Sequence, residues 1–410
     1  MVKSLRGMND ILPPENRRYE RLLAILFETA KAWGLEWIET PILEETALFK
    51  RSVGESSDIV GKEMYQFIDK GSNDVCMRPE GTAGVVRAFI EAKLDRAGGV
   101  HRYFYSGPMY RYERPQKGRL RQFHQFGVEV FGERSVYEDA NLILLAATIF
   151  TRLSIPYRLK INSLGCIKCA PGYRQSLCDF LEGVEGQICE DCERRKVTNP
   201  LRVLDCKNEA CQHLYRHAPK LSEHLCEECV SDLATLEAIL TRHHIPFERD
   251  PNLVRGLDYY SKTAFEFIAD HGLGSQNAIA GGGRYDRLVE MLGGKPTPAV
   301  GFAIGLERIV ELMGEVEEKR EGIWLGALDP EAIETLIDFA QALRPRYKAV
   351  VDYTPRSMAK HLKNADRDHA LYCGVIGSNE FATGTIWIKN LITKEERTLP
   401  ITEATKELTW

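Results

Sequence analysis

Residues 100–132 read VHRYFYSGPMYRYERPQKGRLRQFHQFGVEVFG, and this stretch decides the fold. Two runs rich in aromatic residues, 100–113 and 122–132, alternate apolar with polar positions and flank the polar loop RPQKGRLR. Alternation with a period of two on both sides of a loop is typical of paired antiparallel strands. We therefore predict a domain of α+β class built on an antiparallel sheet.

The charged groups of this hairpin suggest a ligand. Arg111 and Glu113 fall within the first predicted strand and share a face, and so do Gln125 and Glu129 on the second. Unpaired buried charge costs several kcal/mol, so a polar ligand is expected to supply partners. The alternative is a solvated hairpin tip, which would also account for the basic residues of the loop.

The segments on either side of the hairpin predict further elements. An apolar stripe over 15–34 predicts an amphipathic helix that stops at Gly34, and 135–153 predicts a second helix. EWIETPILEE, at 36–45, predicts a strand. Because Pro41 cannot donate to a ladder, we place that strand at a sheet edge or against another subunit.

The chain divides into regions of different texture. Residues 165–245 are rich in Cys, Glu and Arg with short helical patterns, which indicates an inserted, mainly helical domain between 1–164 and 246–320. Residues 323–410 alternate strand with helix and predict a small C-terminal α/β domain.

Composition points to a soluble protein. Of 410 residues, 44% are hydrophobic and 28% charged. MVKSLRGMND has no signal-peptide core, and the longest apolar run, near 140–150, is about half the ~20 residues that span a bilayer. We expect a cytoplasmic protein with no membrane partner. A formal charge of −5 leaves RNA binding open, because local basic patches are independent of the total.

Three further segments carry polar groups in unusual places. In RPEGTAGVVRA (78–88), Glu80 and Thr82 either cap a helix or hold an ammonium group. In PAVGFAIGLERIVELM (298–313), Arg308 is either a surface residue or a ligand contact beside glycines that permit close approach. LVRGLDYYSK (253–262) places an arginine, an aspartate and two tyrosines where a buried strand would start. The Walker, GxGxxG, HExxH and GxSxG motifs do not occur in the structural context that their functions require.

The cysteines of the insertion have metal-site spacing. Three CxxC pairs and one looser pair fit one or two closed Cys₄ zinc sites, structural rather than catalytic; free or oxidised thiols are the alternative. Spacing does not say which pairs combine. The candidate ligands are Cys166, Cys169, Cys189, Cys192, Cys206, Cys211, Cys226 and Cys229.

Together, the helix with its proline strand, the Arg-x-Glu hairpin and the Gly-rich strand entering a helix with arginine resemble the three signature motifs of class II aminoacyl-tRNA synthetases. RPEGTAG and RGLDYY narrow the resemblance to the histidyl-tRNA synthetase family, over the whole chain. The resemblance implies activation of L-histidine by ATP to histidyl-adenylate, then transfer to the 3′ end of tRNA(His) with release of AMP. It also implies a homodimer and a C-terminal anticodon-binding domain at 323–410.

The resemblance also implies roles for individual residues. Arg111 would hold the α-phosphate of ATP and Arg308 the γ-phosphate, with Mg²⁺ bridging the phosphates. Glu113 would meet the adenine amino group, and Arg119 would lie near ATP. Arg255 would reach the histidine carboxylate and the α-phosphate as an electrophile, so the catalytic set is Arg255, Arg111 and Arg308.

Histidine and tRNA contacts follow from the same resemblance. The α-ammonium of histidine would be held by Glu80, Thr82 and Gln125, and its imidazole by Glu129 and Tyr260, with Tyr259 and Tyr285 lining the pocket. Arg114 and Arg121 would meet the tRNA acceptor. Arg356, Lys360, Lys363 and Arg367 fall near helical spacing and are either a phosphate-facing stripe or a solvated face.

Two other functions compete with this one. A non-catalytic paralogue that senses histidine or regulates another enzyme would typically lose RGLDYY and the last domain, and this chain keeps both. A zinc-stabilised RNA-binding protein would not explain the phosphate-binding arginines. Because Arg255 and Tyr260 should face opposite sides of a regular strand, we also expect a bulge or bend near Gly256.

Overall fold

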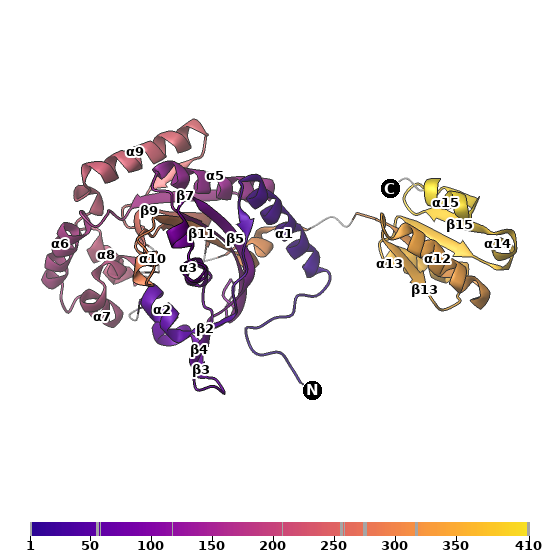
Figure 1. The fold of residues 1–410 in the computed structure, drawn as a ribbon, viewed down its shortest axis with the longest axis horizontal. Coiled ribbons are helices and arrows are strands. Elements are labelled where there is room, and N and C mark those ends of the chain that lie inside the picture. The colour runs from indigo at the N-terminus through magenta and orange to yellow at the C-terminus, as the bar shows by residue number, and fades with distance from the viewer. Residues whose placement is uncertain are drawn as a thin grey trace. The chain divides into compact units, whose positions relative to one another are not determined.

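The computed structural model describes residues 2–54, 57, 59–116, 118–206, 208–254, 257, 259–273, 277–315 and 319–407. The chain forms two compact units, residues 1–315 and 316–410. Each unit has its own sheet and its own core (Figure 1).

An eight-stranded sheet is the frame of the first unit, as the alternating hairpin predicts. Its interior pairs are antiparallel, and the two short edge strands pair parallel with their neighbours. In spatial order the strands are β1 (Glu36–Trp37), β5 (His101–Tyr110), β6 (Gln122–Phe131), β11 (Ala299–Gly305), β10 (Ala278–Arg284), β9 (Ser261–Ala269), β7 (Tyr157–Ser163) and β8 (Phe247–Arg249).

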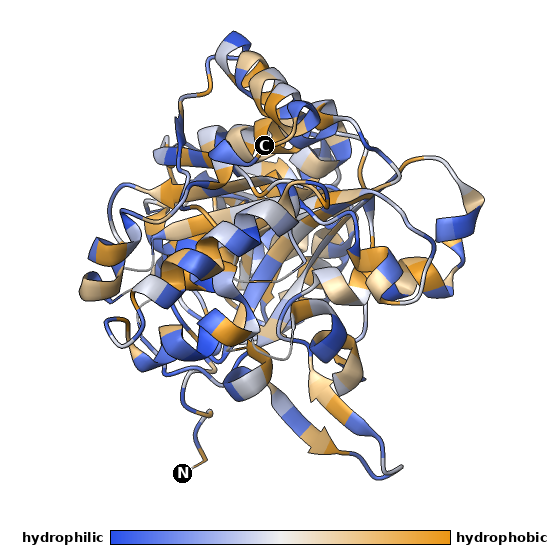
Figure 2. Cartoon of the chain, turned by 90° about the vertical axis from the view of Figure 1, so that its left-hand side faces the viewer, coloured by the Kyte–Doolittle hydropathy of each residue, from blue (hydrophilic) through white to orange (hydrophobic). Residues whose placement is uncertain are grey.

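Strand β6 shows how the sequence assigns the two faces of this sheet. Phe126, Val128 and Val130 point into the main core, whereas the alternate residues Gln125 and Glu129 point to the other face. The main core lies under four helices. These are α1 (Glu15–Ala32), α5 (Val136–Arg152), α9 (Glu227–Arg242) and α11 (Leu306–Leu312). Helical ribbons facing the viewer in Figure 2 carry both hydrophilic and hydrophobic residues.

Helix ends agree with the sequence signals. Gly34, just after α1, has φ +72°, a conformation that glycine adopts at no steric cost. Ser135 caps α5, because its side chain accepts from the N–H of Tyr137.

The opposite face of the sheet carries a second core and a small three-stranded sheet. Val85, Val86 and Phe89 pack there against Phe131 and Tyr285. The elements on this side are α2 (Thr46–Val53), α3 (Thr82–Glu91), α4 (Leu94–Ala97), α10 (Leu288–Met291), the π-helix η1 (Ile59–Glu63), and the sheet β2 (Leu43–Glu45), β4 (Asp74–Met77) and β3 (Tyr65–Ile68).

The strand prediction for 36–45 was wrong in its length. β1 does lie at a sheet edge, but it ends at Trp37, and Pro41 lies in irregular chain before β2 enters the smaller sheet. Residues 253–262 also differ from a regular strand, because β9 begins only at Ser261.

The Cys-rich insertion is mainly helical, as predicted. Its elements are α6 (Ala170–Gly183), α7 (Glu190–Thr198), η2 (Pro200–Asp205), α8 (Glu209–Tyr215), η3 (Leu221–Glu223) and α9. Leu233, Leu236 and Leu240 of α9 nevertheless belong to the core of the main sheet rather than to that of the insertion.

The second unit is an α/β domain with a five-stranded mixed sheet, in the order β13-β12-β14-β15-β16. Its elements are β12 (Ile323–Ala327), η4 (Pro330–Ala332), α12 (Ile333–Leu343), β13 (Ala349–Asp352), α13 (Met358–Arg367), β14 (Tyr372–Ile376), α14 (Ser378–Thr383), β15 (Thr385–Asn390), β16 (Glu396–Pro400) and α15 (Ile401–Glu407).

Candidate active site

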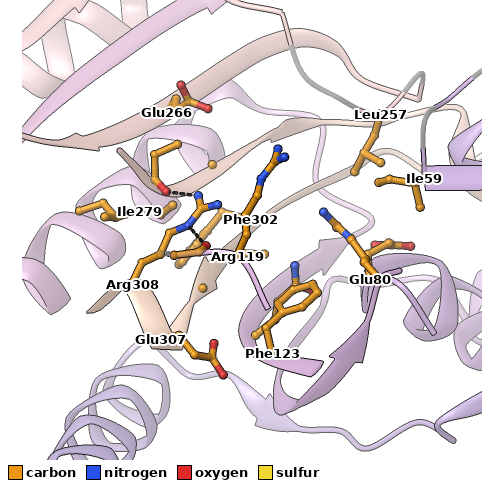
Figure 3. A pocket seen from close by; sticks show the side chains of 18 of the residues that line it. Ile59, Glu80, Arg119, Phe123, Leu257, Glu266, Ile279, Phe302, Glu307 and Arg308 are labelled. Atoms are coloured by element: carbon orange, nitrogen blue, oxygen red, sulfur yellow. Dashed lines mark hydrogen bonds between the residues drawn. The ribbon is translucent and has the colours of Figure 1, made fainter. Parts of the chain in front are cut away.

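A cavity of about 250 Å³ opens on the face of the large sheet opposite the main core (Figure 3). It is lined by the β5–β6 hairpin, the start of α3, the chain before β9, and strands β10 and β11. The site residues expected from the sequence that line it are Glu80, Thr82, Arg111, Glu113, Arg119, Gln125, Tyr259, Tyr260 and Arg308. Arg255, Gly256 and Asp258 lie outside the described residues.

Arg111 and Glu113 follow strand β5 rather than lying within it, which corrects their predicted position. The strand ends at Tyr110, although the N–H of Arg111 still donates to the carbonyl of Arg121 at 2.9 Å. Arg111 Nε donates to the carbonyl of Pro79 at 2.9 Å, and its guanidinium lies 5.1 Å from the Phe123 ring centroid. These contacts fix the side chain while it lines the cavity.

Arg308 points into the cavity, so it is not a surface residue. Its Nε donates to the carbonyl of Gly118 at 3.1 Å and its Nη1 to that of Ala278 at 2.5 Å (Figure 3). Burial lowers the pKa of Arg308, and the charges of Arg119 and Arg111 lower it further. An arginine stays protonated under such shifts, so Arg111, Arg119 and Arg308 bring three positive charges to a cavity whose lining also includes four glutamates.

Glu113 partly balances this charge. Its carboxylate pairs with Arg119 Nε at 3.0 Å and lies 3.9 Å from Arg111 Nη1.

Glu80 both caps a helix and lines the cavity. Its carboxylate accepts from the N–H groups of Thr82 at 2.7 Å and Ala83 at 2.9 Å, the first residues of α3. Burial raises its pKa. Gln125 also lines the cavity, and its Oε1 is buried and has no hydrogen-bond partner among the described residues. Buried polar atoms are normally paired, so Gln125 has spare capacity to bind a polar group.

Glu129 and Tyr285 lie beneath the cavity rather than on its lining. The Glu129 carboxylate accepts from Thr82 Oγ1 at 2.7 Å, from the Tyr105 hydroxyl at 3.2 Å and from the Tyr285 hydroxyl. Burial raises the pKa of Glu129 to about 8, even though these hydrogen bonds oppose the shift.

Gly301, opposite Glu129 on β11, makes room for the carboxylate. A Cβ there would lie 2.0 Å from Glu129 Oε2. The glycine at 301 therefore does allow a close approach, as expected, but the group that approaches it is the Glu129 side chain rather than a ligand. At Gly305 the nearest contact to a Cβ would be 4.0 Å, so that position is not crowded.

Three tyrosine rings form an apolar wall next to Glu129. Tyr259 lies 4.7 Å from Tyr260 and 5.6 Å from Tyr285, measured between ring centroids.

The sequence did not single out Tyr105, Phe123 or Glu266. The ring of Tyr105 fills the space over Gly81 and Gly127, where a Cβ would approach it to 2.2 and 2.1 Å. Gly81 and Gly127 were the only features of the sequence that could have pointed to Tyr105. Their positions along the chain do not predict that they pack against its ring. Glu307, which precedes Arg308, has no role assigned from the sequence. It accepts from the N–H of His124 and so ties α11 to β6.

Comparison with known proteins places this arrangement in a family. A family model described as histidyl-tRNA synthetase matches residues 7–309, and one described as anticodon binding domain matches residues 322–409. The chain belongs to the histidyl-tRNA synthetase family.

Relatives match the chain over nearly its full length. Histidine–tRNA ligases of Sulfurimonas denitrificans and Nitratiruptor sp. are 61% and 60% identical over 97% and 98% of this chain, covering 99% and 98% of their own lengths. The crystal structure of the apo histidyl-tRNA synthetase of S. aureus matches with a TM-score of 0.84 and 33% identity, over 99% of both chains.

Of the two acceptor-binding residues that the histidyl-tRNA synthetase resemblance implies, neither lines the cavity. Arg114 is exposed on the hairpin. Arg121 lies 4.0 Å from the Tyr112 ring centroid, and its Nε donates to the carbonyl of Glu113 at 3.2 Å.

In the unit that matches the anticodon binding domain, Lys360, Lys363 and Arg367 are exposed on α13. Arg356 is not on this helix; it precedes α13 and pairs with Asp352 at 3.0 Å.

The cysteine pairs that spacing left open fall into two groups. Cys166, Cys169, Cys226 and Cys229 form one, which we name the inner cluster. Cys189, Cys192, Cys206 and Cys211 form the other, the outer cluster. Within each, the Sγ atoms lie within 4.8 Å of one another, so each could hold a metal ion. All eleven cysteines are free.

Proposed function

We propose that the cavity carries out the reaction of the histidyl-tRNA synthetase family, the ATP-dependent ligation of L-histidine to tRNA(His). The observation that carries this is that Arg111, Arg119 and Arg308 line one cavity together with the carboxylate of Glu80, which lies across from Arg308 (Figure 3). A triphosphate needs the first set and an ammonium group the second.

The arginine side is proposed to bind ATP. Arg111 would hold the α-phosphate, Arg308 the γ-phosphate, and Arg119 would lie beside them. Glu113 would accept from the adenine amino group. Mg²⁺ held by phosphate oxygens needs few protein ligands, and it would neutralise phosphate charge; the carboxylates of Glu113 and Glu266 also line the cavity.

The other side is proposed to bind histidine. Glu80, Thr82 and Gln125 would surround the α-ammonium, which suits the buried and unpaired Gln125 Oε1. The imidazole would lie among Tyr259, Tyr260 and Tyr285, with Glu129 and Tyr260 as its polar partners. A pocket built to satisfy two ring nitrogens rejects analogues that lack them, because its own buried groups would go unpaired.

Bringing the two substrates together allows the histidine carboxylate to attack the α-phosphorus, with pyrophosphate leaving. Arg111, and by the family resemblance Arg255, would stabilise the charge that develops there. The terminal adenosine hydroxyl of tRNA(His) then attacks the histidyl carbonyl, and AMP leaves.

The tRNA would contact both units. We propose Arg114 and Arg121 for the acceptor end, and Lys360, Lys363 and Arg367 for phosphates near the anticodon, with Arg356 beside them. The charge of α13 is solvent-facing, which suits this role. A solvated helix without ligand remains the competing explanation, and charge reversal at Lys363 would separate the two through tRNA affinity.

A homodimer, structural zinc and the cytoplasm complete the proposal. Trp37 is 55% exposed on the edge strand β1, where a second copy could cover it. No described helix is both long and apolar enough to cross a membrane. The two cysteine clusters would hold zinc.

Histidine-dependent exchange of pyrophosphate into ATP tests this function directly. Arg255→Ala should lose about 3 kcal/mol of transition-state stabilisation, a more than hundredfold fall in exchange, with an unchanged melting temperature. Unchanged exchange in that variant would remove Arg255 from the mechanism. Histidine binding by the wild type without exchange would favour a non-catalytic regulator instead.

A further inference from the structure

The sulfur atoms of both clusters are spaced for a single metal ion. In the inner cluster, Sγ–Sγ distances are 3.7 Å for Cys166–Cys169, 3.8 Å for Cys166–Cys226 and 3.7 Å for Cys169–Cys229. A tetrahedron with Zn–S bonds of about 2.3 Å has edges of about 3.8 Å. A disulfide would need about 2.05 Å. The outer pair Cys189–Cys206, at 3.7 Å, agrees.

Backbone N–H groups point at sulfur in both clusters. The N–H of Cys226 lies 3.1 Å from Cys169 Sγ, and that of Lys168 lies 3.4 Å from Cys166 Sγ. In the outer cluster, the N–H of Cys189 lies 3.1 Å from Cys211 Sγ. Such donors stabilise thiolates and orient metal ligands. Four thiolates would close the coordination sphere of a bound ion, so a metal in either cluster would be structural.

Only the inner cluster, among the described residues, is tied to the chain that enters the histidine side of the cavity. Just before Cys166, the Gly165 carbonyl accepts from the Lys262 N–H at 2.8 Å, and the Leu164 N–H donates to the Lys262 carbonyl at 2.6 Å. From α9, which starts after Cys226, Glu228 and Asp232 bind Lys262 Nζ at 2.7 and 3.0 Å. Lys262 is therefore bound both by the backbone just before Cys166 and by side chains of α9, which follows Cys226.

Lys262 is held in a conformation that needs support. Its φ is +48°, a left-handed conformation that strains a residue with a Cβ. The register of β9 against β10 also shifts here, from Ala264 opposite Gly283 to Ser261 opposite Arg284. Because Lys262 follows Tyr260 by only two residues, we infer that the left-handed backbone and the register shift at Lys262 determine the positions of Tyr259 and Tyr260.

The outer cluster has different surroundings. Cys192, Cys206 and Cys211 are buried in a core made of insertion residues such as Leu177 and Val203. A metal there would hold α7, η2 and α8 together.

We propose that each cluster binds one Zn²⁺ and that the inner zinc, through Lys262, positions Tyr259 and Tyr260, so that its occupancy sets the affinity for histidine. This inference rests on the proposed function only for the identity of the amino acid in the cavity.

Metal content is the first test. The full chain, purified under reducing conditions, should contain two zinc ions by mass spectrometry of the metals. Cys226→Ser with Cys229→Ser, and separately Cys206→Ser with Cys211→Ser, should each leave one. Fewer than two in the wild type, or iron in place of zinc, overturns the assignment.

Calorimetric titration with L-histidine is the second test. The inner double variant should bind histidine about tenfold more weakly, because small displacements of binding groups are costly. Lys262→Met should weaken histidine similarly while keeping two zinc ions, which separates positioning from misfolding. Lys168→Met is the matched control: its side chain also faces Glu228, at 3.8 Å, but is 74% exposed, and it should change neither value.

Unaltered histidine affinity in Lys262→Met would refute the coupling, even if the inner double variant fails to fold. Failure of the proposed function is distinguishable, because it would show as histidine binding without pyrophosphate exchange, at full zinc content.

Discussion

Replacing Glu129 with glutamine tests the histidine side of the cavity with almost no change of shape. The carboxylate accepts three hydrogen bonds, two at Oε1 and one at Oε2. An amide keeps one accepting oxygen, so at least one hydroxyl loses its acceptor and the imidazole loses its carboxyl partner. A buried hydrogen-bonding group left without a partner costs about 1–3 kcal/mol, which predicts histidine affinity about 5- to 150-fold weaker.

The same substitution should alter the pH dependence of stability. The pKa of Glu129 rises from 4.5 to about 8 on folding, so its contribution is fully present below pH 4.5 and is lost as the pH rises through 8. Each pH unit in this window carries at most about 1.4 kcal/mol. Glu129→Gln should therefore lose less unfolding free energy than the wild type between pH 5 and pH 8.

Two assays check this reasoning: pyrophosphate exchange with varied histidine or ATP, and denaturant unfolding across the pH range. KM for histidine should rise while KM for ATP stays within about twofold. Equal losses for both substrates would show that Glu129 supports the cavity as a whole. Parallel stability curves for the two proteins would show that its buried carboxyl is not the titrating group.

The remaining predictions concern Gly301, Arg308 and Asp139. Gly301→Ala should destabilise the fold by about 1–3 kcal/mol and weaken histidine binding, because its Cβ would clash with Glu129 and would lie 2.4 Å from the carbonyl oxygen of Val128. Gly305→Ala, where a Cβ has no close neighbour, is the control for stability. Equal free energies of unfolding for the two variants would contradict the predicted crowding at Gly301. Arg308→Ala should raise KM for ATP about 10- to 100-fold with histidine affinity unchanged in calorimetry, and a primary loss of histidine affinity would reverse the assignment of the two sides. Asp139→Ala should cost about 3–5 kcal/mol in denaturant unfolding, because it removes the buried carboxylate that pairs with the fully buried Arg284 at 2.7 Å; a loss under 1 kcal/mol would mean that Asp286, 3.3 Å from Arg284 Nη1, is a sufficient partner.

The residues that the sequence placed correctly follow simple periodicity. Gln125 and Glu129 lie four apart on a regular strand, so their shared face could be predicted, as could the helix after Ser135. The predicted strand position of Arg111 and Glu113 was wrong, because their loop lies beyond the last ladder residue and is fixed by contacts such as that of Arg111 with Pro79.

Long-range contacts limited the rest of the prediction. The contact of Tyr105 with Glu129 depends on how two strands pair and on space left by glycines. Which cysteines combine depends on where α9 returns, since Cys226 meets Cys166 only after the whole insertion. Spacing along the chain does not contain that information.

The position of α9 has a consequence for how the chain can vary. Its leucines pack in the main core, while the residue before its first turn, Cys226, stands 3.8 Å in Sγ–Sγ distance from Cys166, which follows β7. The chain thus leaves the large sheet after β7 and returns to it at α9, close to where it left. Because the two ends of the segment between Cys169 and Cys226 already lie together, we expect that this segment can change in length or sequence without altering the register of the sheet.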